Sequence, residues 1–358
     1  MGIPVDVRLC VASLTPASVD ASAPRLEAAP TAPSAKGAAT LHETGPDVMT
    51  RAFIFPGQGS QVVGMGKALA EISQPARHVF AEVDDALGEN LSRIMFEGPV
   101  EELTLTANAQ PALMAASLAV VRALEFERGL DLARDAACVA GHSLGEYSAL
   151  AAAGTFSVAD TARLLRIRGE AMQRAVAPGE GAMAALIGPD LATAHAIAEE
   201  AAEDQVCGVA NDNGAGQVVL SGHRDAIERA VTIAQKRGVK RAILLNVSAP
   251  FHCALMGPAA DAMREALAAV SMRPPSVPVY ANVTAGPLSD PEAIRGALVA
   301  QVTGTVRWAE SVAAMAASGV DRFYELGAGK VLTGLVKRIA PATTASAVGS
   351  ADDVAAYA

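Results

Sequence analysis

One short stretch limits the folds that this chain can adopt more than any other. Residues 136–150 (AACVAGHSLGEYSAL) pass from an apolar strand through a turn into an alanine-rich helix. Ser143 stands at the turn, with Gly141 two positions before it and Gly145 two positions after it, the G-x-S-x-G pattern of a nucleophile elbow. In so strained a turn, a side chain at either glycine would collide with neighbouring backbone. The stretch therefore predicts an α/β fold with a serine nucleophile. The alternative interpretation is an ordinary tight turn.

Strands and helices alternate along much of the chain. Apolar residues 51–55 predict the first strand, and two glycines around Gln58 allow the following loop to approach another part of the molecule. A helix is predicted over residues 67–87. Pro111 is typical of a first helical residue, which places Gln110 at the N-terminus of the next helix. The alternation predicts a mostly parallel sheet with flanking helices.

Residues 178–246 follow a different order, βαββαβ, which is that of a ferredoxin-like unit. After them the alternation of strands and helices resumes and continues to about residue 339. We therefore predict a discontinuous large α/β domain with an α/β-hydrolase-like core, residues 49–177 and 247–358, and an inserted ferredoxin-like subdomain, residues 178–246.

The first 48 residues differ in composition from the rest. They are rich in Pro, Ala, Ser and Thr and show no sustained hydrophobic period, so residues 1–48 are predicted to be a disordered extension. Asp6 and Arg8 interrupt the first apolar residues, which disfavours a secretory signal. We expect the working part of the protein to begin at Met49.

Composition excludes several classes of protein. Although 51% of the 358 residues are hydrophobic, no run approaches the roughly 18 to 20 apolar residues that span a bilayer, so no membrane segment is expected. The net charge of −10 argues against a general nucleic-acid binder. The cysteines lack metal-ligand spacing, which favours reduced thiols in a cytoplasmic protein without a metal site: Cys10, Cys138, Cys207 and Cys253.

The helix predicted over residues 157–176 carries an arginine on its apolar face. Arg168 would be buried there, and a buried guanidinium needs an anion to offset its desolvation. A core carboxylate and a bound ligand are equally good candidates for that anion. Arg166 falls outside the apolar stripe, where we expect it to pair with Glu170 at the surface.

A serine nucleophile needs a base, usually histidine. Of the six histidines, His142 adjoins Ser143 but would point away from it. His252 lies in a Pro-containing loop between a strand end and a helix start, where α/β folds place functional groups. It is therefore the candidate base, and a surface position is the alternative. Cys253 follows His252 directly, so the two side chains cannot meet productively.

Five motifs occur together and in order. They are residues 55–61 (FPGQGSQ), 141–146 (GHSLGE), 168–169 (RG), 248–252 (SAPFH), and Gln301 followed by residues 306–308 (VRW). In this combination the chain resembles the malonyl-CoA:acyl carrier protein transacylases of type II fatty-acid synthesis, from Met49 to about residue 339. The resemblance implies that Ser143 is the acylated nucleophile and His252 its base, with the backbone amides of Gln58 and Leu144 as the oxyanion hole.

The resemblance also implies a carboxylate site. Arg168 would bind the malonyl carboxylate, the backbone carbonyl of Gln301 would hold the histidine ring in place of an aspartate, and Gln110 would be a polar pocket residue. The implied partners are malonyl-CoA and acyl carrier protein, with no cofactor, and the enzyme is expected to be a monomer. Ala328 departs from the family, where proline is frequent, and Phe251 replaces a common serine with a bulky residue that favours malonyl over methylmalonyl.

Two other functions stay open. A serine thioesterase or hydrolase would need an acid between serine and histidine and an HGGG-type loop, and the chain could instead load malonyl groups in a polyketide pathway. A scaffold that only binds carrier protein is disfavoured by the intact Ser143, His252 and Arg168. Two basic groups are candidates for docking an acidic carrier protein: Lys236, Arg237, Lys240 and Arg241, or Lys330, Lys337 and Arg338. The alternative is that both groups are ordinary surface charge.

Overall fold

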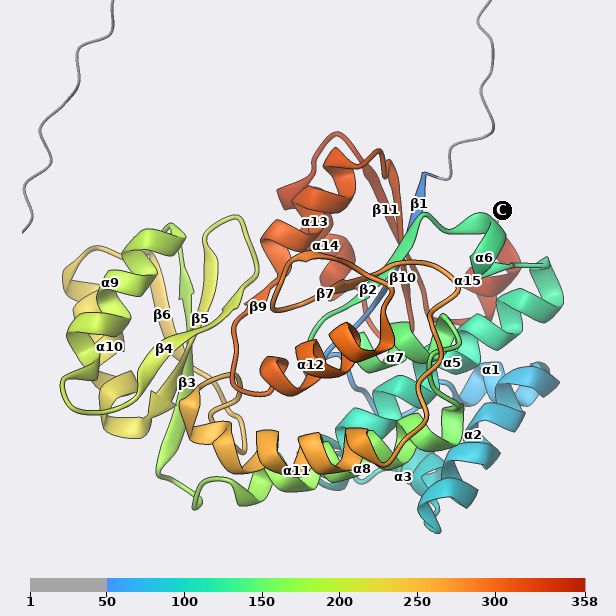
Figure 1. Cartoon of the computed structure of the whole chain (residues 1–358), viewed down its shortest axis with the longest axis horizontal. Helices are drawn as coiled ribbons and strands as arrows, with labels where there is room; N and C mark the ends of the chain where they lie inside the picture. The colour runs from blue at the N-terminus through green and yellow to red at the C-terminus, as the bar shows by residue number, and fades with distance from the viewer. Residues whose placement is uncertain (1–49, 358) are drawn as a thin grey trace, which may run out of the picture. The chain divides into compact units, whose positions relative to one another are not determined.

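The computed structural model describes residues 50–357, which belong to one compact unit of the chain. The predicted disordered extension, residues 1–48, lies outside the described residues. Six strands form one sheet in the order β11-β10-β1-β2-β7-β8, and all neighbours are parallel except β7 and β8 (Figure 1). The strands are β1 (Arg51–Phe55), β2 (Cys138–Gly141), β7 (Val279–Ala281), β8 (Gly286–Leu288), β10 (Arg322–Leu326) and β11 (Thr344–Val348).

Helices cover both faces of this sheet. Phe53 and Phe55 of β1 point into one core, and Ala52 and Ile54 point into another. Because successive side chains of a strand face opposite ways, a wholly apolar strand has to be covered on both faces. The first core is shared with α5 (Thr106–Arg128), α7 (Gly145–Ala152) and α8 (Val158–Arg174), and the second with α13 (Trp308–Ala317) and α14 (Val331–Ile339).

A second sheet has the strand order β6-β3-β5-β4-β9 and lies at the left in Figure 1. Its first four strands are antiparallel, and α9 and α10 share a separate core with them. β9 runs parallel to β4 and leads directly into α13, so it joins this sheet to the larger part. The elements are β3 (Gly181–Ile187), α9 (Leu191–Ala202), β4 (Cys207–Asp212), β5 (Gln217–His223), α10 (Arg224–Lys236), β6 (Arg241–Leu244) and β9 (Val306–Arg307).

The single helix predicted after the first strand is in fact two, α1 (Lys67–Ile72) and α2 (Gln74–Leu87). Pro75 has no N–H with which to continue helical hydrogen bonding across the junction. Arg77 caps the end of α1 instead, donating from Nε to the Ala70 carbonyl at 2.9 Å.

The expectation that Gln110 marks a helix N-terminus is wrong. α5 begins at Thr106, and the Leu105 carbonyl closes its first turn by accepting from the Ala109 N–H at 2.8 Å. Pro111 lies in the second turn, where its missing N–H removes only one intrahelical hydrogen bond. Gln110 is consequently a buried residue within the helix.

The remaining helical elements contribute apolar residues to the first core. None of the helices within residues 50–357 is long and apolar enough to cross a membrane. These elements are α3 (Leu91–Glu97), α4 (Val100–Thr104), α6 (Leu132–Asp135), the 3-10 turn η1 (Ala254–Met256), α11 (Gly257–Ala268), α12 (Pro291–Gln301) and α15 (Ala351–Ala356).

Candidate active site

The turn at Ser143 has the strained geometry that its glycines predict. Ser143 adopts a φ of 55° between β2 and α7. A Cβ added at Gly141 would lie 1.9 Å from the backbone of Gly145, and one at Gly145 would lie 2.3 Å from the Phe55 carbonyl oxygen. No side chain fits at these distances. The turn places Ser143 at the carboxyl ends of β1 and β2, where parallel sheets present functional groups.

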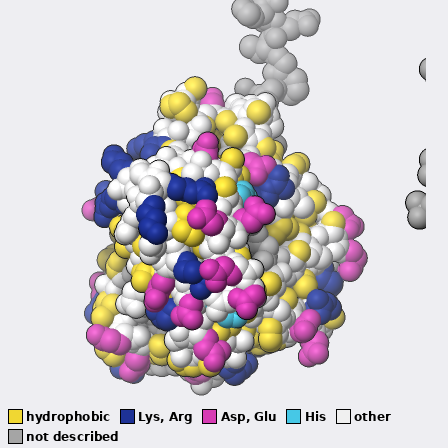
Figure 2. Space-filling model, turned by 90° about the vertical axis from the view of Figure 1, so that its left-hand side faces the viewer, with side chains coloured by type: hydrophobic (Ala, Val, Ile, Leu, Met, Phe, Trp, Pro, Cys, Tyr) yellow, Lys and Arg dark blue, Asp and Glu magenta, His cyan; other side chains and the backbone are white. Residues whose placement is uncertain are grey.

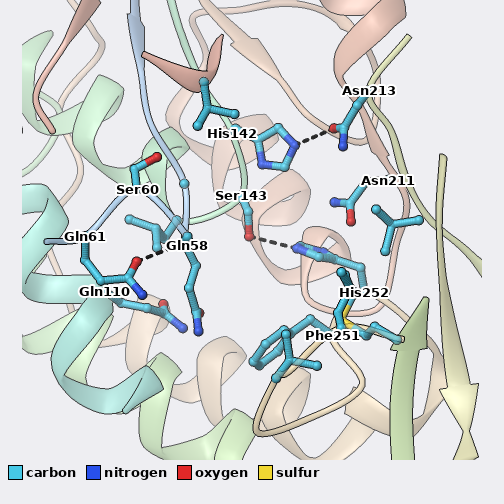
Figure 3. A pocket seen from close by; sticks show the side chains of 18 of the residues that line it. Gln58, Ser60, Gln61, Gln110, His142, Ser143, Asn211, Asn213, Phe251 and His252 are labelled. Atoms are coloured by element: carbon cyan, nitrogen blue, oxygen red, sulfur yellow. Dashed lines mark hydrogen bonds between the residues drawn. The ribbon is translucent and has the colours of Figure 1, made fainter. Parts of the chain in front are cut away.

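His252 lies within hydrogen-bond distance of this serine. Its Nε2 is 2.7 Å from Ser143 Oγ (Figure 3), and its Nδ1 is 2.8 Å from the backbone oxygen of Gln301. Because a carbonyl only accepts, Nδ1 carries the proton and Nε2 accepts from the serine hydroxyl. Burial, and then the charge of Arg168, lower the pKa of His252 to about 3. The imidazole is therefore neutral at pH 7, as a base has to be.

Arg168 is buried beside the same serine, with 1% of its surface exposed. Nη1 donates to Gln110 Oε1 at 2.8 Å, and Nη2 donates to Gln301 Oε1 at 2.7 Å and to Ser143 Oγ at 3.3 Å. Within residues 50–357, no carboxylate oxygen lies within 4.0 Å of the guanidinium and Nε has no hydrogen-bond partner. From the sequence, the anion beside Arg168 could be a core carboxylate or a bound ligand. In this part of the chain, no carboxylate contacts the guanidinium directly.

The predicted surface pair of Arg166 and Glu170 is wrong. Arg166 Nη2 contacts Glu89 Oε2 at 2.9 Å and Nη1 donates to Asn108 Oδ1 at 2.9 Å, and only 15% of the Arg166 side chain is exposed. Glu170 pairs with Arg174 at 3.3 Å instead. The packing of α2 and α5 against α8 brings Glu89 and Asn108 within reach, and helical spacing does not reveal this.

The loop after β1 brings the Gln58 backbone close to the elbow. A Cβ at Gly57 would lie 2.7 Å from the His142 carbonyl oxygen, so this approach requires glycine. Gln58 Nε2 donates to Thr106 Oγ1 at 3.2 Å, which anchors the side chain. Neither the Gln58 nor the Leu144 backbone N–H donates a hydrogen bond to any residue that the structure describes, and both residues line the same pocket.

The pocket has a volume of about 370 Å³, and its walls come from strands of the second sheet and from the loops that follow β1 and β2. In Figure 3, Ser143 lies near its centre and Phe251 lies below His252. Phe251 is 9% exposed. Asn211 and Asn213 come from β4 and the loop after it, and His142 Nε2 bonds to Asn213 Oδ1 at 2.9 Å. His142 is therefore turned away from the serine, as the sequence suggested.

Comparison with known proteins identifies the family. Residues 52–353 match the model of the acyl transferase domain. The malonyl CoA-acyl carrier protein transacylase of Escherichia coli K12 is 48% identical over 305 residues, which are 85% of this chain and 97% of that protein. The chain belongs to the malonyl-CoA:acyl carrier protein transacylase family.

Solved structures of transacylases share the mixed α/β fold with its two sheets. The acyl-carrier-protein-S-malonyltransferase of Bartonella henselae has a TM-score of 0.84 and 59% identity, covering 86% of this chain and 98% of that one. A malonyl-transacylase solved in complex with a type II PKS acyl-carrier protein has a TM-score of 0.82 and 43% identity, covering 85% and 97%.

Two residues for which the sequence predicted no role complete the candidate active site. Asn282 Oδ1 accepts from the Ser143 N–H at 2.7 Å and its Nδ2 donates to the Gly141 carbonyl at 2.7 Å, so it clamps the elbow. Glu146 Oε2 accepts from the Asn282 N–H at 3.0 Å and from Gln301 Nε2 at 2.8 Å. Glu146 is the last residue of the motif GHSLGE, so the sequence offered a signal for its role in the site. Nothing local marks Asn282, because its position depends on β7 pairing beside β2.

The three cysteines that the structure describes do not compete with Ser143 as nucleophiles. Burial raises the pKa of Cys138 to about 12 and that of Cys207 to about 11, and it also raises the pKa of Cys253. Cys253 Sγ donates to the Pro250 carbonyl at 3.1 Å. These thiols are protonated at pH 7 and are poor nucleophiles. Among the described residues, no three His, Cys, Asp or Glu side chains are grouped as metal ligands would be.

Proposed function

We propose that this protein transfers the malonyl group of malonyl-CoA to the phosphopantetheine thiol of an acyl carrier protein, through an ester on Ser143. One observation carries the proposal: Ser143 Oγ lies 2.7 Å from His252 Nε2 and 3.3 Å from Arg168 Nη2 in a single pocket. A nucleophile, a base and a buried cation thus converge on one point. The names of the relatives, which are malonyl transacylases, support the same acyl group and acceptor.

In the first half-reaction, His252 takes the proton of Ser143 as Oγ attacks the thioester carbon. The C–S bond then breaks, and coenzyme A leaves with the proton from His252. The Gln301 carbonyl accepts from Nδ1–H at 2.8 Å and keeps the ring in the tautomer that this transfer needs. A carbonyl in this position makes an aspartate unnecessary for orienting the base.

The oxyanion of the tetrahedral intermediate would be held by the backbone amides of Gln58 and Leu144. Both amides line the pocket, and neither is engaged with a described residue. The positive end of the α7 dipole adds to the field at the same point. Each such donor contributes about 3 to 4 kcal/mol to transition-state stabilisation.

Arg168 would bind the free carboxylate of the malonyl group. Gln110 and Gln301 hold its guanidinium by hydrogen bonds of 2.8 and 2.7 Å without neutralising it. Because no carboxylate among the described residues contacts this buried guanidinium directly, the site favours an anionic ligand. Phe251 lines the same pocket, and its bulk would oppose a branched acyl group.

In the second half-reaction, the carrier-protein thiol attacks the malonyl ester by the same route in reverse. Since the enzyme carries a net charge of −10, an acidic carrier protein would need a local basic contact. On the face beside α9 and α10, basic and acidic side chains are interspersed (Figure 2). We favour the other basic group, because Val331 and Leu335 of α14 line the pocket next to it: Lys330, Lys337 and Arg338.

We further propose that residues 178–246 form a ferredoxin-like subdomain inserted into an α/β-hydrolase-like large domain of residues 49–177 and 247–358. The strand order β6-β3-β5-β4 with two helices supports the first part, and the strand–serine–helix turn supports the second. We also propose that the enzyme works as a cytoplasmic monomer, without a cofactor, a membrane or nucleic acid.

Intact-mass spectrometry tests the function. Wild-type protein mixed with malonyl-CoA should gain the mass of one malonyl group and lose it to holo acyl carrier protein, and Ser143→Ala should gain nothing. Label on Ser143→Ala would reveal another nucleophile and contradict the proposal. Rapid loss of the malonyl group to water, with no acceptor present, would indicate a hydrolase instead.

A further inference from the structure

Glu146 is a buried carboxyl group that the proposed reaction does not use. It lies in the first turn of α7, and 1% of its surface is exposed. Its Oε2 accepts from the Asn282 backbone N–H at 3.0 Å and from Gln301 Nε2 at 2.8 Å. Burial raises the pKa of Glu146 to about 7. Both protonation states are therefore populated near neutral pH.

Both partners of Glu146 hold reacting groups. Asn282 Oδ1 accepts from the Ser143 backbone N–H at 2.7 Å and so orients the elbow. Gln301 accepts from His252 Nδ1 on its backbone oxygen at 2.8 Å. One carboxyl group thus holds Asn282, which orients the nucleophile, and Gln301, which orients the base. Loss of its hydrogen bonds would disturb the positions of the nucleophile and the base.

The side chain of Gln301 also links Glu146 to Arg168. Its Oε1 accepts from Arg168 Nη2 at 2.7 Å while its Nε2 donates to Glu146 Oε2 at 2.8 Å. The other titratable groups facing this cluster are neutral at pH 7, because burial raises the pKa of Tyr147 and lowers that of His252. Within the cluster, Glu146 is the only described group that can balance the guanidinium charge.

We propose that Glu146 is a positioning residue and that its carboxylate is the resident counter-charge of Arg168, protonated from solvent when a substrate carboxylate binds. The inference rests on the proposed malonyl transfer. Two carboxylates near one guanidinium repel each other, so the arrival of the substrate's carboxylate favours the protonated form of Glu146. The proton returns to solvent when the malonyl group leaves, so acyl transfer itself stays balanced.

Two variants separate positioning from charge. Glu146→Gln keeps an oxygen that can accept both hydrogen bonds but carries no charge, and Glu146→Ala keeps neither. Because small displacements of reacting groups are costly, we expect Glu146→Ala to lower kcat about 10²-fold for malonyl and acetyl transfer alike, and Glu146→Gln to stay within about tenfold of wild type. Wild-type kcat in Glu146→Ala, or equal losses in the two variants, would overturn the positioning role.

Calorimetry in buffers of different ionisation enthalpy tests the counter-charge. In a Ser143→Ala background, which binds acyl-CoA without reacting, the enzyme should take up part of a proton from solvent when malonyl-CoA binds at pH 7. It should take up none when acetyl-CoA binds, because acetyl-CoA shares the coenzyme phosphates but has no carboxylate. Since the pKa of Glu146 is raised to about 7, the uptake should fade towards about pH 5, where the group is already protonated.

Adding Glu146→Gln should abolish the uptake. Uptake that persists in the double variant, or no uptake with malonyl-CoA at pH 7, would contradict the counter-charge. A different result would contradict the proposed function, namely no malonyl ester on Ser143 of the wild-type protein in the mass-spectrometry test.

Discussion

Replacing Arg168 with alanine tests the carboxylate site directly. A bidentate arginine–carboxylate pair makes two charge-assisted hydrogen bonds, each contributing about 1.5 to 3 kcal/mol. Arg168 is 1% exposed, so these bonds form away from the solvent that weakens ion pairs at the surface. The loss of about 3 to 6 kcal/mol predicts that kcat/KM for malonyl-CoA falls about 10² to 10⁴-fold.

Acetyl-CoA supplies the control, because acetyl has only hydrogen where malonyl carries its carboxylate. Arg168→Ala also leaves Gln110 Oε1 and Gln301 Oε1 without their donor and removes a contact to Ser143 Oγ. These side effects act on both substrates, so the ratio of the two kcat/KM values isolates the carboxylate.

The assay is quenched-flow acylation with each acyl-CoA, read by intact mass. We expect the malonyl-to-acetyl ratio to fall by at least about 10²-fold in Arg168→Ala. A matched control is Arg166→Ala on the same helix, whose partner is Glu89 and which should leave the ratio unchanged. Equal losses for malonyl and acetyl in Arg168→Ala would refute the role of this guanidinium in binding the carboxylate.

Two further predictions concern pH and the glycines. Because the folded-state pKa of His252 is lowered to about 3 from 6.5, the neutral base persists below pH 6.5. The acid limb of kcat/KM should therefore lie below 6.5, and an acid limb at or above 6.5 would contradict this. His252 should also lower stability as pH drops from 6.5, since only the unfolded chain then takes up its proton. Glu146, whose pKa is raised to about 7, contributes in the opposite sense, so the His252 effect should be measured in Glu146→Gln. Gly145→Ala should lower the free energy of unfolding by at least about 1 to 3 kcal/mol, because its Cβ would lie 2.3 Å from Phe55 O. Gly296→Ala inside α12, with nothing within 4 Å of its Cβ, should raise it by about 0.5 to 1 kcal/mol in the same denaturant titration.

The candidate site was visible in the sequence wherever a residue's constraint is local. Gly141 and Gly145 flank Ser143 at a fixed spacing, and a sharp turn demands them whatever the rest of the chain does. Arg168 stood out because it interrupts an apolar helical stripe. Local patterns failed at helix boundaries, as around Pro111, which lies inside α5 although proline is most typical of a first helical residue.

Other parts of the site depend on packing between distant elements. Glu89 reaches Arg166 only because α2 lies against α8, and Asn282 clamps the elbow only because β7 pairs with β2. The order β11-β10-β1-β2-β7-β8 is likewise not the order of the strands in the chain. Periodicity says which face of an element is apolar, and it does not say which other element covers that face.

By itself, the sequence determined the α/β alternation, the strained serine turn and the presence of a cation on a buried face, because each follows from backbone conformation and the period of side chains. Only the tertiary structure decided that His252, Arg168 and Ser143 meet, and that Glu146 joins the residues behind them. Those contacts are a few ångströms long and link residues far apart in the chain. They exist because whole helices and strands pack in one arrangement, which no local pattern encodes.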